Sequence, residues 1–183
     1  NCKLRSARLG AVDGRCSRVV VTPASCRSGS FISSRKSPSG NFSSSEIWHY
    51  VQDILRVAGL AAYFELISTE QVGNAAAALD GAKRVLYYNP KWVDGIAKTD
   101  RWRMYGLLAH EIGHHLQGHT LRKTGSAPPI EVEADRYAGF VLAKLGADLP
   151  QSTSLWNSIS EQASATHPGR ADRIAKVTEG WKA

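Results

Sequence analysis

Two histidines four residues apart flank a glutamate in the segment HEIGHH at residues 110–115. Residues four apart share one face of a helix, so the imidazoles of His110 and His114 can point at one position. Two nitrogen ligands at this separation are typical of a zinc site that carries a glutamate beside the first histidine. We therefore expect His110 and His114 to bind the metal, and Glu111 to deprotonate a water molecule that the metal activates.

A catalytic zinc site needs a third protein ligand and one open position. The segment EVEAD at 131–135 places Glu131 and Asp135 on one helical face. We expect Glu131 to be the third ligand, and Asp135 to accept a hydrogen bond from the far ring nitrogen of a zinc-bound histidine. Glu133 lies off this face, so we interpret it as a solvated acid that complements the helix dipole.

Two further histidines follow the first pair. His115 is adjacent to a ligand and must point elsewhere, and His119 lies near the expected helix end, where a cation suits the dipole. We place both outside the metal shell. The alternative for the whole motif is a helix with ordinary core histidines, because short patterns of this kind also arise by chance. The acidic pair downstream favours the metal site.

Two neighbouring helices must position these side chains. Thr99 or Asp100 can begin a helix that carries the histidines toward Gly118. Pro128-Pro129 can open the next helix, which Gly146 ends. The short connection between the two favours close packing around the metal.

The remaining pattern predicts an α+β fold that is mostly helical with a small β-sheet. Ser45 can cap a helix that ends near Gly59, and apolar residues recur along it at helical spacing. Residues 63–67 and 84–88 are strand candidates, the second stopped by Asn89-Pro90, and shorter helices are expected at 151–162 and 168–178. The periodic apolar residues of the first helix are Ile47, Tyr50, Val51, Ile54 and Leu55.

The net charge of +7 lies in the N-terminal segment, because residues 1–45 hold eight basic residues and one acid. The same segment holds twelve serines and the three cysteines Cys2, Cys16 and Cys26. It has too few apolar residues to offset its ordering entropy, so we expect it to be disordered. Organelle transit peptides share this composition, and an unrelated tail is the alternative. The sequence thus predicts a tail at 1–45 and a domain at 46–183.

The charge also bears on partners. The domain has equal numbers of basic and acidic residues, so we expect no nucleic-acid partner for it. No apolar run approaches the roughly 18 residues that a transmembrane helix needs. The composition suits a soluble domain of the cytoplasm, the periplasm or an organelle. The sequence does not indicate the oligomeric state.

The segments HEIGHH at 110–115 and EVEADRYAGFVLAKLGA at 131–147 resemble the M48 family of zinc metallopeptidases. These are gluzincins, a group that includes the Oma1-, HtpX- and Ste24-like proteases, and the resemblance is to their compact soluble members. It implies a zincin-like fold, one Zn²⁺ per chain, and metalloendopeptidase activity on a polypeptide substrate. It also implies Glu131 as the third ligand, with Asp135 behind it.

A further segment, THPGR at 166–170, is similar to one that follows the glutamate helix in this family. The resemblance implies that His167 approaches the metal, where it either hydrogen-bonds the oxyanion or caps zinc in a resting state. The alternative is a turn that leads into the last helix, with Pro168 at its first position. Arg170 and Arg173 either bind a substrate carboxylate or form surface salt bridges.

We expect the substrate to lie extended beside residues 84–88, as an added edge strand. Zinc and His167 would then stabilise the tetrahedral oxyanion while Glu111 transfers the proton. Two alternatives differ in function. One is a regulatory zincin of the ImmA/IrrE type, which cleaves a repressor partner, and the other is a non-catalytic zinc-binding module.

Overall fold

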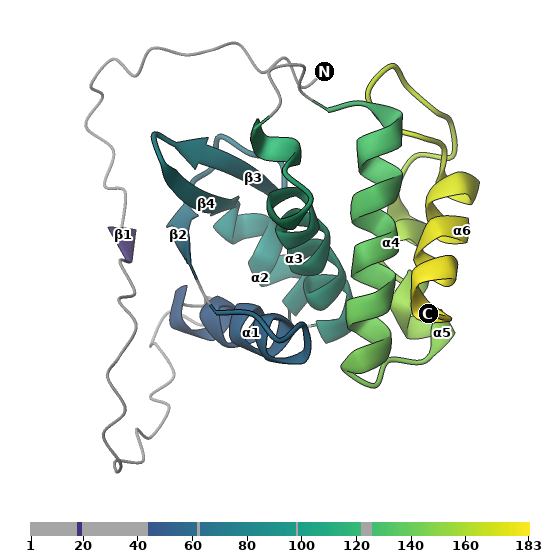
Figure 1. Cartoon of the computed structure of the whole chain (residues 1–183), viewed down its shortest axis with the longest axis horizontal. Coiled ribbons are helices and arrows are strands. Elements are labelled where there is room, and N and C mark those ends of the chain that lie inside the picture. The colour runs from purple at the N-terminus through teal and green to yellow at the C-terminus, as the bar shows by residue number, and fades with distance from the viewer. Residues whose placement is uncertain (1–17, 20–43, 62, 98, 122–125) are drawn as a thin grey trace.

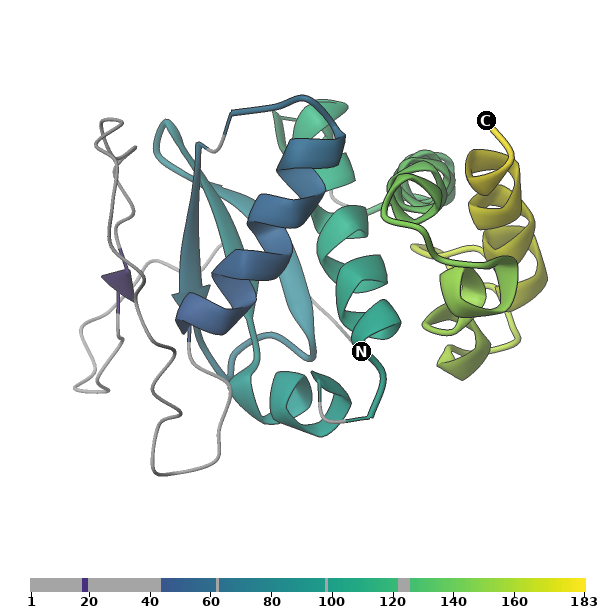
Figure 2. The ribbon, with the colours of Figure 1, turned by 90° about the horizontal axis from the view of Figure 1, so that it is seen from below.

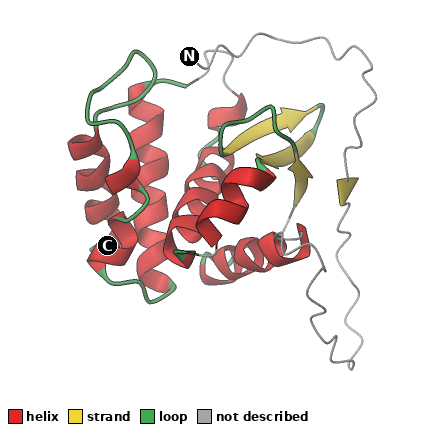
Figure 3. Cartoon of the chain, turned by 180° about the vertical axis from the view of Figure 1, so that it is seen from behind, coloured by secondary structure: helices red, strands yellow, loops and turns green. Residues whose placement is uncertain are grey.

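The computed structural model describes residues 18–19, 44–61, 63–97, 99–121 and 126–183. A small sheet lies at one end, and helices form the rest of the molecule in successive layers (Figures 1 and 2). The predicted α+β class is therefore confirmed (Figure 3). The expectation of a disordered tail concerns residues 1–17 and 20–43, which lie outside the described ones, as do the three cysteines.

The sheet is mixed, with the order β1-β2-β4-β3. β2 (Phe64–Ser68) pairs in parallel with β4 (Lys83–Tyr88), while β3 (Ala75–Asp80) pairs antiparallel with β4 on its other side. The two-residue strand β1 (Arg18–Val19) pairs with β2. β4 is thus an interior strand, so the expectation that substrate adds beside residues 84–88 is wrong. Within the described sheet, β3 is the edge strand beside β4, and the edge of β3 that faces away from β4 is free.

Both predicted strands are confirmed with small shifts, but β3 was not predicted. Its sequence AAAALD is rich in alanine, a residue that favours helices, and pairing with β4 determines its conformation instead. Helix α2 (Pro90–Ala97) was also missed, because Asn89-Pro90 was interpreted only as a strand stop. Asn89 caps this helix, since its side-chain oxygen accepts hydrogen bonds from the amides of Lys91 and Trp92.

Helix α1 (Ser44–Val57) begins one residue before the expected cap and buries its apolar face, including Ile47 and Val51. Helix α3 (Arg101–Leu116) begins at the predicted cap, where the Asp100 carboxylate accepts hydrogen bonds from two first-turn amides. A 3-10 turn, η1 (His119–Leu121), follows it. Helix α4 (Pro128–Lys144) begins at the predicted prolines and ends just before Gly146, which has a φ of +89°.

The predicted helix at 151–162 is wrong in its extent. The chain there forms α5 (Leu149–Thr153) and a 3-10 turn, η2 (Trp156–Ser158), and no helix continues to residue 162. An Asp148–Gln151 capping box begins α5 early, and the Thr153 hydroxyl bonds to a carbonyl of the helix, a local contact that competes with helix extension. The last helix, α6, spans Arg170–Trp181, slightly later than predicted.

The core lies between the sheet and helices α1, α3 and α4, and α6 packs on the far face of α4 (Figure 2). α4 and α6 approach closely because glycines face the partner backbone: a Cβ at Gly139 would overlap the Val177 carbonyl, and one at Gly180 would overlap the Arg136 carbonyl. No helix among the described residues is long and apolar enough to cross a membrane.

Candidate metal centre

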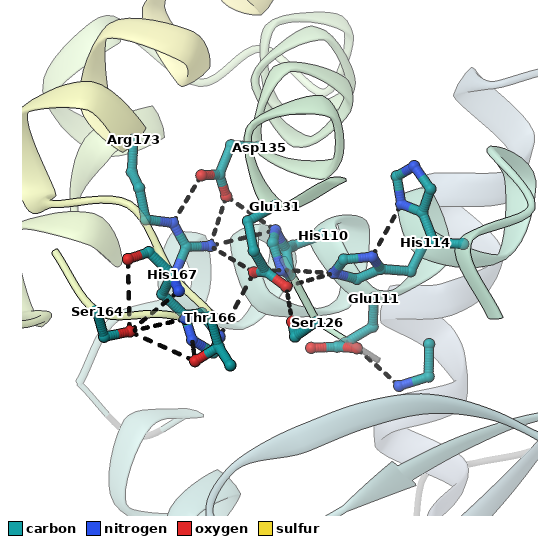
Figure 4. Close-up of polar contacts among 12 residues, drawn as sticks. His110, Glu111, His114, Ser126, Glu131, Asp135, Ser164, Thr166, His167 and Arg173 are labelled. Carbon is teal, nitrogen blue, oxygen red and sulfur yellow. Dashed lines mark hydrogen bonds and ion pairs between the residues drawn. The ribbon is translucent and has the colours of Figure 1, made fainter. Parts of the chain in front are cut away.

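His110, His114 and Glu131 meet between α3 and α4 (Figure 4). Among the described residues they are the cluster that can hold a metal ion, and their donor atoms all lie within 4.8 Å of one another. The two histidine Nε2 atoms are 3.0 Å apart, and the Glu131 oxygens lie 3.3 Å from that of His110 and 3.6 Å from that of His114. Ligands about 2 Å from a tetrahedral zinc ion are about 3.3 Å apart, so the three residues fit zinc.

The local sequence explains why these side chains converge. His110 and His114 are one helical turn apart on α3, and Glu131 lies in the first turn of α4. The helices come close at Gly113, where a Cβ would lie only 3.0 Å from the Tyr137 ring and 3.4 Å from the Ala134 backbone. The glycine beside His114 therefore lets α4 bring its carboxylate to the histidines.

The site has a strong charge pattern. Burial alone would lower the pKa of His110, but the carboxylates of Asp135 and Glu131 raise it to about 10. Burial and the neighbouring His110 lower the pKa of His114 to about 3. Burial opposes ionisation of Glu131, yet hydrogen bonding to His110 holds its pKa at about 2. His110 and the Arg173 guanidinium supply positive charge to the buried carboxylates, and a divalent cation would take the place of the His110 proton beside Glu131.

His110 is held from behind by Asp135. The His110 Nδ1 lies 2.8 Å from the Asp135 Oδ1, as expected for an aspartate that orients a ligand. Arg173 donates to both oxygens of the same carboxylate, from Nε at 2.6 Å and Nη2 at 2.7 Å. The indole of Trp156 donates to it as well, at 2.8 Å. Arg173 is a buried partner of Asp135. Neither expectation for it, binding a substrate carboxylate or forming a surface salt bridge, is therefore supported.

Trp156 and Ser126 also form hydrogen bonds with residues of the site, and the sequence did not predict either of them. The hydroxyl of Ser126 donates a short hydrogen bond to Glu131. Neither residue belongs to a spacing pattern with the motif, so only the fold brings them to the site.

Glu111 lies beside the three candidate ligands and is not one of them. It is buried, and its Oε2 accepts a 2.7 Å hydrogen bond from the backbone amide of Ala77 on β3. Burial raises the pKa of Glu111 above its usual range, which improves a carboxylate as a proton acceptor near neutral pH. The contact also shows that the free edge of β3 faces this carboxylate.

His167 lies at the rim of the cluster. Its Nε2 is 3.6 Å from the Glu131 Oε2, its side chain is 47% exposed, and the Thr166 hydroxyl contacts its Nδ1 at 2.8 Å. Arg170 pairs with the exposed Glu161, as the salt-bridge alternative expected.

The other histidines of the segment are not among the three candidate ligands. His115 is buried away from them, 3.0 Å from the Val85 carbonyl. His119 Nδ1 lies 3.0 Å from His114 Nδ1, and its Nε2 lies 2.8 Å from Glu133. Glu133 is 55% exposed, as its interpretation as a solvated acid expected, and in addition it pairs with His119.

The comparisons agree with this geometry at a coarse level. A family model described as "Putative metallopeptidase domain" matches residues 47–179, which include all the site residues described above. No curated protein and no solved structure matches the chain in these comparisons. The match extends from α1 to α6 and so covers most of the chain. The chain belongs to this metallopeptidase domain family.

Proposed function

We propose that this protein is a zinc-dependent metalloendopeptidase whose zinc ligands are His110, His114 and Glu131. The observation that carries the proposal is the convergence of two imidazoles and a carboxylate at zinc-like separations, with Glu111 beside them. One Zn²⁺ per chain satisfies this set, because three protein ligands leave a fourth position open.

Bound zinc would supply Lewis-acid activation of a water molecule and of the scissile carbonyl. Glu111 then takes the proton of the attacking water and transfers it to the leaving amine. The Ala77 amide holds the Glu111 carboxylate in place for this transfer. His167, exposed at the rim, donates a hydrogen bond to the oxyanion that develops on the substrate.

We propose that the polypeptide substrate pairs with β3. This strand has a free edge within the described sheet, and the Ala77 amide on that edge points to Glu111. An extended peptide added here would place its backbone beside the general base. The run of alanines at 75–78 leaves this edge without bulky side chains.

We also propose that the protein is a metallopeptidase of the M48-like type. Its domain begins near residue 46. The one-turn spacing of Glu131 and Asp135 on α4 and the approach of His167 to the ligands support the M48-like type. A regulatory zincin would share the chemistry and differ in its substrate. A binding module would hold zinc without turnover.

The decisive experiment replaces the base and keeps the ligands. We expect Glu111→Gln to retain one zinc per chain and to lose peptide cleavage by at least about 100-fold, since general base catalysis contributes on the order of 10²–10⁴-fold. Metal content is measured by elemental analysis and cleavage with casein. Chelation should inactivate the wild type, and zinc should restore it.

Glu70→Gln is the matched control, because Glu70 is an exposed carboxylate that pairs with Lys91. It should retain both zinc and activity. Casein cleavage by Glu111→Gln at the wild-type rate would refute the mechanism. Zinc bound by a wild type that cleaves no peptide would favour the binding module.

A second variant separates the two roles of His167. If it stabilises the oxyanion, His167→Ala should lower kcat by about 100–1000-fold and leave the zinc affinity unchanged. Weaker zinc binding together with faster cleavage would instead indicate a resting-state cap.

A further inference from the structure

The polar partners of His114 extend beyond the three metal ligands. Its Nε2 faces His110 and Glu131 (Figure 4), and its Nδ1 lies 3.0 Å from the Nδ1 of His119. His119 is buried, and its second nitrogen lies 2.8 Å from a carboxylate oxygen of Glu133. His114, His119 and Glu133 therefore form an unbroken chain that begins at the candidate metal position.

The chain has a defined hydrogen-bond direction once a metal occupies the site. A neutral imidazole carries one N–H, so a ligand that binds metal through Nε2 must carry its proton on Nδ1. That proton is donated to the Nδ1 of His119, which must then carry its own proton on Nε2. The Glu133 carboxylate accepts this proton. The Glu133 carboxylate at the end of the chain thus fixes the tautomers of His114 and His119.

The backbone is shaped to make this contact. α3 ends before Gly118, whose φ of +72° lies in the left-handed region that favours glycine. The turn η1 then returns His119 toward His114, five residues earlier. The Gln117 side chain donates to the Glu133 carbonyl and so ties the end of α3 to α4.

We infer that His119 and Glu133 are positioning residues that hold His114 in the orientation and tautomer required for zinc binding. The inference rests on the proposed zinc site, but it concerns metal affinity and not hydrolysis. Partners of this kind behind a metal-bound histidine are typically worth 10–100-fold in metal affinity or activity. Glu133 acts through His119 and touches neither metal nor substrate.

The test measures the zinc dissociation constant of the full chain by competition with a chromophoric chelator. We expect about 10–100-fold weaker binding for His119→Phe, which keeps a ring and removes both hydrogen bonds. Glu133→Ala should weaken binding, and Glu133→Gln less so, because its amide oxygen still accepts the His119 proton. Since the Glu133 side chain is 55% exposed, these two variants should fold.

Two further measurements separate positioning from folding. Urea denaturation of the metal-free variants reports a purely structural role. The visible absorption bands of bound Co²⁺ report the ligand geometry, and they should change in His119→Phe. Glu179→Gln is the control, because Glu179 is a carboxylate that binds Arg136 of the same helix as Glu133.

The affinity order wild type, Glu133→Gln, Glu133→Ala would support the inference, even if the wild type binds zinc and cleaves no peptide. Folded variants that all bind zinc within threefold of the wild type would overturn it, whether or not their stability falls. A wild type that binds no zinc would overturn both this inference and the proposed function.

Discussion

The two histidines of the candidate metal centre lie on one helix, yet they are held in different ways. His110 contacts Asp135, which is fully buried and accepts hydrogen bonds from α6 and η2. His114 contacts His119, which follows five residues later and depends on the half-exposed Glu133. The first arrangement is assembled from distant parts of the chain, and the second mainly from the loop that ends α3.

The proposed zinc binding should therefore be coupled to folding stability more strongly at His110 than at His114. Removing one partner of a buried ion pair strongly destabilises the fold, because the remaining buried charge has neither its partner nor water around it. A partner at the rim can be replaced with little structural cost. We therefore expect substitutions around His110 to lower the folding stability, and substitutions around His114 to lower the metal affinity alone.

The largest effect is expected for Asp135→Ala. This change leaves the buried Arg173 guanidinium without its main partner and should cost about 3–5 kcal/mol of unfolding free energy. It should also weaken zinc binding by about 10–100-fold, because His110 loses its acceptor. Urea denaturation of the metal-free protein and chelator competition measure the two effects. A loss of stability below about 1 kcal/mol would contradict the proposed difference between the two histidines, since that is the size expected of an exposed pair.

An intermediate effect is expected for Gly180→Ala. The added Cβ would overlap the Arg136 carbonyl, so α6 must move away from α4, at a cost of about 1–3 kcal/mol. Because α6 carries Arg173, zinc affinity should fall with stability. Gly95→Ala in α2 is the control: a Cβ at that position would meet no atom within 4 Å, so the change should be neutral or stabilise by up to about 1 kcal/mol. Equal results for the two variants would show that the helix contact is not tight.

The smallest effect is expected for Trp156→Phe. This variant keeps an aromatic ring in the core and removes one hydrogen bond to Asp135. Arg173 and His110 still contact that carboxylate, so the expected cost is about 0.5–1.5 kcal/mol, measured by thermal or urea unfolding. A loss as large as that of Asp135→Ala would mean that the indole, and not the guanidinium, is the main support on this side.

The sequence predicted the parts that depend on local spacing. Periodicity and capping residues indicated α1, α3 and α4, and one-turn spacing predicted that His110, His114, Glu131 and Asp135 would come together. The helices and the two one-turn pairs depend on residues within a few positions of one another, and the short connection between the helices favoured their close packing. The metallopeptidase family was confirmed, whereas the M48 assignment and the role of each site residue stay predictions.

The parts that sequence could not predict depend on long-range pairing. β3 consists mostly of alanines and becomes a strand through its pairing with β4, which in turn moves the expected substrate edge from 84–88 to 75–80. The burial of Arg173 follows from a close contact between two glycine-bearing helix faces. The contact between Glu133 and His119 was missed because helical spacing alone gave no reason to join the two residues.

Helix α4 carries Glu131, Glu133 and Asp135, so a single helix bears the candidate carboxylate ligand, the aspartate that contacts His110 and the glutamate that contacts His119. Any small rotation of that helix would shift all three contacts together. We therefore expect its substitutions to combine non-additively, and the preference for ions of different radius to vary with the tilt of this single element.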